Sequence, residues 1–249
     1  MQGSHCGERE NVSDSLLNRN KKYGIIIKLL KSMRKDSKEG RINFNQETEA
    51  GMNEKFFDLK REKQDRMINA GLKIFAKNGY RHATTDDIVK EAGISKGLLF
   101  HYFTNKAGVY VFLVDYSVRF LMLELSRYVK KDTTDFFDVC KQIEMGKLQV
   151  LKIYPYMQAF LDKAFEEVCM EALEECEVQK QVYRKKLEEY YAQASGYKFK
   201  NQVTTEQMLT LFRYIIKGIT AENMAMDTMQ PEIMYSQVCE YIEMMRGVY

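Results

Sequence analysis

Residues 79–106 read GYRHATTDDIVKEAGISKGLLFHYFTNK, and this stretch decides the fold. Thr84 is followed three residues later by Asp87, the spacing of a capping box, in which two side chains satisfy backbone NH groups of a first helical turn. The box predicts a short helix that ends at Gly93. Ser95 is a favourable N-cap for the next helix. Two short helices joined by a tight turn that contains Gly form a helix-turn-helix.

Helical patterns continue on both sides of this stretch. Apolar residues at helical spacing predict a first helix over 53–77, closed by Asn78-Gly79, and the helix after Ser95 is expected over 96–103. Downstream helices are expected at about 106–130, 133–152, 155–176, 177–195, 204–226 and 231–247, with Pro155 and Pro231 in first turns. Alternating β-branched runs are absent, so the chain is predicted to be all-α, with Ser195–Asn201 as its clearest interior loop.

Composition narrows the class of protein. The chain has 249 residues, of which 45% are hydrophobic, 29% are charged and 2 are Pro, and this excludes collagen, mucin and wholly disordered proteins. The longest apolar stretch, 109–125, is interrupted by Asp115 and Arg119, whereas a membrane span needs roughly 20 apolar residues. No apolar secretory signal follows Met1. We therefore expect no membrane segment and a cytoplasmic protein.

Cysteine and histidine argue against metal or disulfide chemistry. The five Cys residues are scattered without a Cys-x-x-Cys, so they are interpreted as free thiols. The three His residues all lie in the first half of the chain. The acidic run 166–177 contains Cys169 and Cys176 but no His, and a solvated acidic helix face is the better interpretation. We expect no metal site and no cofactor.

Charge is distributed unevenly and indicates a domain division. Residues 60–106 carry 10 Lys and Arg against 5 Asp and Glu, a local charge of +5, whereas residues 107–249 carry 17 against 21, a local charge of −4. This asymmetry is typical of a small polyanion-binding module joined to a larger domain. The predicted division is a helix-turn-helix domain over 52–106 and a larger helical domain over 107–249.

The first 51 residues are rich in Asn, Ser, Lys, Glu and Gly. Their one apolar cluster is too small for a core, so we expect disorder with one short helix near 23–35. Met52 resembles a natural start, which makes 1–51 an upstream extension or an over-called start. The alternative is a basic arm that adds nonspecific DNA affinity.

Residues 60–110 resemble the DNA-binding domain of the TetR/AcrR family of bacterial transcriptional regulators. The resemblance rests on Gly79, Thr84, Ile88, the Ala92-Gly93-Ile94-Ser95 run, and the Gly, aromatic, Phe and Lys residues up to Lys106. It implies a homodimer that binds a palindromic double-stranded DNA operator, with the helix after Ser95 in the major groove. It also implies that the larger domain binds a small-molecule effector. We expect a repressor more often than an activator, and, because the large domain shows no recognisable catalytic cluster, a protein that is not an enzyme and has no catalytic residues.

The DNA contacts are expected on and around that helix. Leu99 and Phe103 are interpreted as core, and the remaining residues of the helix as its exposed faces. Hydroxyl and ammonium groups suit phosphates, Lys96 and His101 also suit base acceptors, and Leu98 or Phe100 suits a thymine methyl. Gly97 lets the backbone approach the duplex. The candidate DNA-binding residues are Thr84, Thr85, Ser95, Lys96, Gly97, Leu98, Phe100, His101, Tyr102 and Lys106.

Two residues depart from the family pattern in this region. Asp86 stands where a basic or neutral residue often lies near DNA, and Gly108 interrupts the start of the following helix at a cost near 1 kcal/mol.

The larger domain is expected to hold the effector and the dimer interface. Abundant Tyr, Met and Phe favour an apolar or aromatic effector, with Tyr156, Phe160 and Tyr183 as candidate contacts. Apolar residues spread over more than one face of the helices at 204–226 and 231–247, so each helix needs a second partner. A four-helix dimer interface is predicted from Phe212, Ile216, Ile219, Val238, Ile242 and Met245.

Two alternatives to an effector-responsive regulator are left open. One is a DNA-binding regulator without an effector, either constitutive or controlled by a protein partner. The other is an all-α enzyme or interaction module that kept this N-terminal layout, although its large domain shows no recognisable catalytic cluster.

Overall fold

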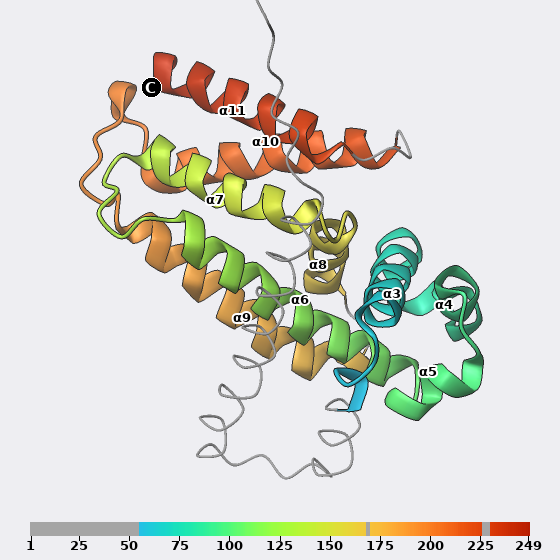
Figure 1. Ribbon diagram of the computed structural model, residues 1–249. Coiled ribbons are helices and arrows are strands. Elements are labelled where there is room, and N and C mark those ends of the chain that lie inside the picture. Colours follow the sequence, from blue (N-terminus) through green and yellow to red (C-terminus); the bar gives the residue numbers. More distant parts are fainter. Residues whose placement is uncertain (1–54, 168–169, 226–229) are drawn as a thin grey trace, which may run out of the picture. The chain divides into compact units, whose positions relative to one another are not determined.

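The computed structural model describes residues 55–167, 170–225 and 230–249 (Figure 1). Every regular element in these ranges is helical, which confirms the predicted all-α class. Predictions for residues 1–51 and for Met52 lie outside the described residues, as does Cys169. The helices are α3 (Arg61–His82), α4 (Thr85–Ala92), α5 (Lys96–Tyr102), α6 (Lys106–Tyr128), α7 (Phe136–Leu151), α8 (Met157–Glu166), α9 (Met170–Ala192), α10 (Thr205–Ala225) and α11 (Pro231–Val248), with a 3-10 turn η2 (Lys200–Gln202).

The helix boundaries around the helix-turn-helix follow the capping signals. The Thr84 hydroxyl accepts a hydrogen bond from the Asp87 NH at 3.1 Å, and the Ser95 hydroxyl accepts one from the Leu98 NH at 3.2 Å. Gly93 ends α4 in the left-handed conformation with a φ of 61°. Gly79 has a φ of 69° and kinks α3 near its end, at the predicted break. These caps and turns confirm the predicted helix-turn-helix.

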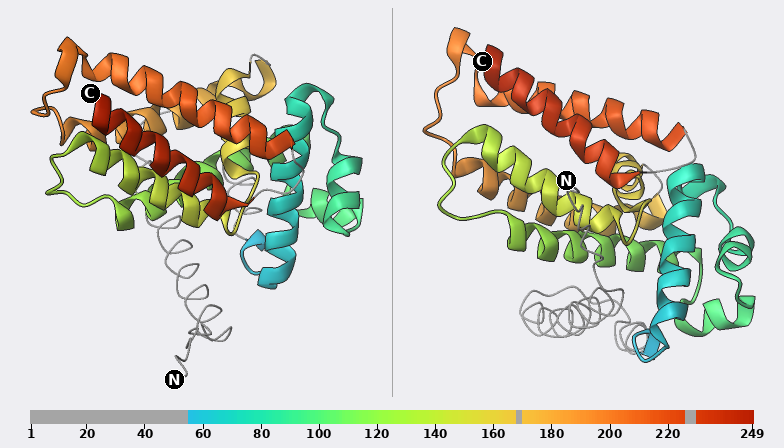
Figure 2. Two further views of the ribbon diagram at one scale, coloured as in Figure 1. Left: turned by 90° about the horizontal axis from the view of Figure 1, so that it is seen from above. Right: turned by 45° about the horizontal axis from the view of Figure 1, so that its top comes forward.

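The remaining helices form a bundle that extends from this motif (Figure 1). α6 leads from α5 into the bundle and packs against α7 and α9. α11 lies along α7, and α10 lies along α11 (Figure 2). α8 is short and packs against α3, so it joins the helix-turn-helix domain to the bundle.

Two predicted helix boundaries are wrong. The predicted break near residue 176 does not exist, because α9 runs through that position from Met170 to Ala192. Pro155 lies in the turn before α8 rather than in its first helical turn. No Gly or Pro marks the end of α8 at Glu166, so composition gave no signal for it.

The first long helix also begins later than predicted. Residues 57–60 form a turn, and α3 starts at Arg61. The side-chain amide of Gln64 donates to the carbonyl oxygens of Phe57 and Leu59, at 3.0 Å and 2.7 Å. These side-chain hydrogen bonds stabilise a turn that the local sequence does not predict.

Among the described helices, none combines the length and apolarity that crossing a bilayer requires.

Candidate functional site

The helix-turn-helix presents one face of α5 to solvent. Lys96, Gly97, Phe100 and His101 are exposed, and Leu98 is half-buried. Leu99 and Phe103 are buried as predicted. This exposed face is the candidate site.

Tyr102 was predicted on the exposed faces of α5, and that placement is wrong. The residue is only 8% exposed. Its ring lies edge-on to Phe56, with centroids 5.8 Å apart, and to His101 at 4.8 Å. Phe56 precedes α3 and also contacts Phe103 and Phe112, so an aromatic cluster holds α5 against the start of α6. Tyr102 is therefore mainly a packing residue of this domain.

Lys96, the only basic side chain of α5 apart from His101, is already paired. Its Nζ lies 2.8 Å from Asp86 Oδ1 on α4, and both side chains are more than half exposed. Thr84 and Thr85 lie at the start of the same helix, Thr84 exposed and Thr85 half-buried. The departure noted at Asp86 thus has a structural consequence, because its carboxylate draws the Lys96 ammonium toward α4.

Lys106 lies between α3 and α6 rather than on an open surface. Its Nζ donates to the carbonyl oxygens of Tyr80 at 3.0 Å and Ala83 at 3.3 Å, and it lies 4.5 Å from the centre of the Tyr80 ring. These contacts satisfy carbonyl groups after the Gly79 kink. An ammonium has three donors, so a phosphate contact remains compatible with this position.

α8 connects the helix-turn-helix domain to the bundle through polar contacts that sequence reasoning missed. Lys163 Nζ donates to the carbonyl oxygen of Lys77 at 2.9 Å. The backbone NH of Tyr80 donates to Glu167 Oε2 at 3.2 Å. These partners are 86 and 87 residues apart in sequence, so no local pattern could have paired them.

A buried tyrosine pair adds a third connection between the domains. The Tyr154 hydroxyl, in the turn before α8, donates to Asp65 Oδ1 on α3 at 3.1 Å. The same hydroxyl lies 2.8 Å from that of Tyr116 on α6. Contacts at both ends of α8 therefore couple any movement of α8 to α3.

The three candidate effector residues are not brought together. Phe160 is fully buried beside Phe75 and Tyr110, so it belongs to the core between α8, α3 and α6. Tyr156 is half-buried, with Lys77 Nζ 5.9 Å from its ring centre. Tyr183 is buried on α9 against Phe165. None of the three lines the small hollow between α7 and α11, whose walls include Glu144, Lys147, Leu148, Met234 and Tyr235.

Polar groups lie inside the bundle where the sequence suggested mainly apolar ones. Lys147 is ion-paired with Glu144 at 2.7 Å on α7, and the Gln158 amide donates to Asp162 at 2.8 Å on α8. Burial raises the pKa of Asp162, because the charged form loses solvation. Burial likewise raises the pKa of Tyr183, beside these two pairs. For Lys147, burial favours the neutral amine, but the Glu144 carboxylate together with Tyr183 and Tyr191 outweighs burial, and the pKa is raised.

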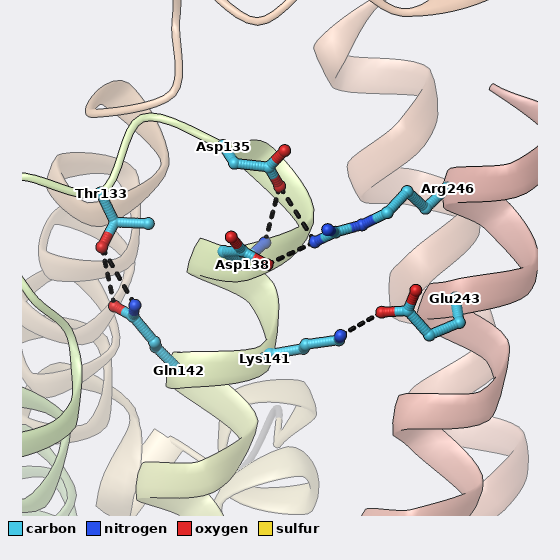
Figure 3. A network of polar contacts seen from close by, with 7 residues as sticks. All are labelled: Thr133, Asp135, Asp138, Lys141, Gln142, Glu243 and Arg246. Atoms are coloured by element: carbon cyan, nitrogen blue, oxygen red, sulfur yellow. Dashed lines mark hydrogen bonds and ion pairs between the residues drawn. The ribbon is translucent and has the colours of Figure 1, made fainter.

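The predicted dimer residues are mostly inside the protomer, and their place in a dimer interface stays a prediction. The five that are buried are Phe212, Ile219, Val238, Ile242 and Met245, and Ile216 is half-buried. α11 packs along α7, and ion pairs join the two helices (Figure 3). Arg246 contacts Asp135 and Asp138, and Lys141 contacts Glu243.

A different set of apolar side chains on α10 and α11 is exposed. Tyr214 is 69% exposed and Met244 57% exposed. Among the residues of α10 and α11 whose burial the structure describes, the exposed large apolar side chains are Leu211, Tyr214, Ile233, Tyr241, Met244 and Val248, which we call the outer apolar set. The second partner expected for these helices stays a prediction, and these exposed residues, which differ from the predicted ones, are available for it.

The helix-turn-helix segment matches a known family of proteins. The family model of the tetR family of bacterial regulatory proteins matches residues 67–111, from within α3 to the start of α6. This segment of the chain is similar to the DNA-binding segment of that family. Over 56 residues it is 36% identical to the HTH-type transcriptional regulator YuxN of Bacillus subtilis, and over 54 residues 35% identical to that organism's fatty acid metabolism regulator protein. These matches cover 22% of this chain and only 19% and 28% of the two relatives.

Solved TetR-family structures share the fold over most of the chain. A regulator from Chloroflexus aurantiacus matches with a TM-score of 0.56 and 21% identity, covering 78% of this chain and 96% of that one. The regulator FadR of Bacillus subtilis, solved in complex with stearoyl-CoA, matches with a TM-score of 0.50 and 17% identity, covering 74% and 98%. At these identities the likeness shows the fold alone.

Proposed function

We propose that this protein is a TetR-family transcriptional regulator that binds a palindromic DNA operator as a homodimer and is released by a small-molecule effector. The observation that carries the proposal is the exposed face of α5, held by a capped helix-turn-helix within a segment of local charge +5. A helix of this size fits the major groove, and the positive charge favours the phosphate backbone. A regulator of this kind acts as a repressor when its operator overlaps a promoter.

In the proposed complex, α5 lies in the major groove. The hydroxyls of Thr84, Thr85 and Ser95 and the ammonium of Lys106 contact phosphates and set the register. Lys96, Gly97, Leu98, Phe100 and His101 face the base edges, while the Tyr102 ring supports the helix from behind and leaves its hydroxyl to a phosphate. In a dimer, the two α5 helices lie about 34 Å apart, one turn of B-DNA.

The outer apolar set is the proposed dimer surface. It lies on the two helices for which the sequence predicted a second partner, and apolar groups of this size on one surface are typical of interaction sites. Pairing α10 and α11 with their symmetry mates forms a four-helix interface. The buried residues Val238, Ile242 and Met245 support this interface from inside the protomer.

The proposed effector acts inside the bundle and is read out through α8. Tyr183, one of the predicted contacts, lies beside the buried Gln158 and Asp162 of α8, and α8 is bonded to α3 through Lys163 and Tyr154. A ligand that displaces α8 therefore changes the tilt of α3 and α6 and the spacing of the two α5 helices. The buried polar groups favour an apolar or aromatic effector that also forms hydrogen bonds.

Selection from a random pool of DNA duplexes with the full chain tests the DNA-binding proposal. We expect a preferred palindromic sequence that binds the dimer far more tightly than competitor DNA at the same salt concentration. Absence of any preferred duplex at low ionic strength, or a strictly monomeric protein, would refute the proposal.

Thermal melts across a panel of small molecules separate the effector-responsive regulator from one without an effector. A compound that binds the folded protein raises the melting temperature. We expect at least one such compound also to release the selected duplex, because its affinity differs between the two conformations. Compounds that stabilise the protein without releasing DNA would favour the effector-free alternative.

A further inference from the structure

Neither the backbone conformation nor the packing of α5 requires a glycine at position 97. Gly97 lies inside α5, where glycine weakens a helix relative to alanine. Its φ is not positive, unlike those of Gly79 and Gly93. A Cβ placed on Gly97 meets no atom within 4 Å beyond its chain neighbours and the backbone of its own helix. Neither backbone conformation nor internal packing explains the missing side chain, so its explanation lies with something that approaches α5 from outside.

Phe100, three residues further along the same helix, is exposed although it is large and apolar. The residue is 36% exposed. Within the described part of α3, α4 and α5, no other large hydrophobic side chain is exposed. Residues three apart on a helix are neighbours on its surface. Gly97 and Phe100 therefore form a small apolar area beside a position that has no side chain.

The other side chains of α5 offer little hydrogen-bonding capacity for bases. The helix contains no Arg, Asn, Gln, Asp or Glu, the residue types that make the most specific hydrogen bonds to base edges. Lys96 is paired with Asp86, and Leu99 and Tyr102 are buried. Apart from His101, the area that remains to discriminate bases is the apolar one at Phe100, with Leu98 beside it.

We propose that α5 reads thymine, with the Phe100 ring packed on the C5 methyl group of a thymine and Gly97 giving the base edge room to approach the helix. The C5 methyl is the one apolar group that a base pair presents in the major groove, so an apolar side chain distinguishes thymine from cytosine there. This inference rests on the proposed DNA binding. It adds the class of base that the half-site must contain.

Replacing thymine by uracil in the selected duplex removes only the methyl group and tests the contact directly. We expect one thymine in each half-site at which dU weakens binding about fourfold, the fold-change equivalent to about 0.8 kcal/mol for one buried carbon. Substitution in both half-sites multiplies the two effects. Other thymines of the same duplex serve as matched controls and should show no change.

Phe100→Ala should bind the thymine duplex more weakly and should no longer distinguish it from the uracil duplex. Phe100→Leu keeps an apolar group and should retain part of the discrimination. If Phe100→Ala still discriminates as well as the parent protein, or if no thymine responds to dU in the parent protein, the proposed contact is wrong. Because the selected duplex would still bind in either case, that failure is distinguishable from a failure of DNA binding itself.

Gly97→Ala supplies an independent readout. We expect a higher melting temperature, because alanine favours the helix and meets no atom beyond its chain neighbours and the backbone of its own helix, together with weaker binding of the selected duplex. Higher stability with unchanged affinity would show that nothing approaches α5 at Gly97 and would contradict the proposal.

Discussion

The ammonium of Lys106 donates a hydrogen bond to the carbonyl oxygen of Tyr80 at 3.0 Å and lies over the ring of the same tyrosine. The first residue of α6 is thereby fixed to the last turn of α3, just after the kink at Gly79. Since α5 leads directly into α6, this contact helps to set how α5 is presented. Lys106 therefore holds α6 against α3 and is also the proposed phosphate contact.

Lys106→Ala should lower both stability and the salt dependence of DNA binding. Loss of the charge-assisted bonds to two carbonyl groups should reduce the free energy of unfolding by about 1.5–3 kcal/mol, measured by urea denaturation. Loss of a phosphate contact should make the slope of log K against log salt shallower by about one unit, with sequence preference unchanged. An unchanged slope with reduced stability would leave Lys106 a positioning role only.

Asp86→Asn should strengthen DNA binding by releasing Lys96. The pair is exposed, so its loss should change the free energy of unfolding by no more than about 1 kcal/mol. The free ammonium and the lost negative charge should raise affinity for duplex DNA several-fold and steepen its salt dependence. Fluorescence anisotropy titrations at two salt concentrations measure both.

Glu91→Gln is the matched control for this variant. Glu91 forms a similar exposed pair with Lys73, at 2.7 Å, and its substitution removes one negative charge from the same domain. An equal gain in affinity for both variants would show that net charge alone is responsible, and would contradict a specific role for the Asp86–Lys96 pair.

Tyr214→Glu and Met244→Glu should convert the proposed dimer to a monomer without unfolding the protomer. Both side chains belong to the outer apolar set and are largely exposed, so a carboxylate is tolerated in the monomer but not inside an apolar interface. Sedimentation analysis measures the change. Val178→Glu on α9, also exposed, is the control that should remain dimeric. A dimer that survives both α10 and α11 substitutions would place the interface elsewhere.

Asp162→Asn should have an effect on stability that grows with pH. Burial raises the pKa of Asp162 in the folded protein above its ordinary value, so the folded state holds the proton more tightly than the unfolded chain. The parent protein therefore loses stability as pH rises from the ordinary aspartate pKa through the raised one. Asparagine does not titrate, and its side-chain oxygen still accepts from Gln158.

The measurement is the free energy of unfolding of both proteins at several pH values. The variant's stability relative to the parent should increase with pH across this window and level off above it. A difference that is constant with pH would contradict the assignment of a desolvated carboxyl to Asp162.

The helix-turn-helix is the part of this protein that the sequence determined by itself. Thr84, Gly93 and Ser95 act on the backbone within a few residues of their own position, so their caps and turns were predictable from order along the chain. The exposed and buried faces of α5 followed from helical periodicity in the same way, with Tyr102 as the exception. Its burial depends on Phe56, 46 positions earlier, which no local pattern includes.

Tertiary structure decided which apolar face of each long helix is core and which is surface. Val238 and Tyr241 lie on one helix at spacings that periodicity alone does not distinguish, yet the first is buried against the protomer and the second is exposed. The difference arises because α11 packs on α7, where Arg246 meets Asp135 across 111 residues of sequence. Likewise, only the folded chain brings Lys163 to the end of α3. Short-range hydrogen bonds can be deduced from neighbouring residues, whereas burial depends on partners that the chain supplies from far away.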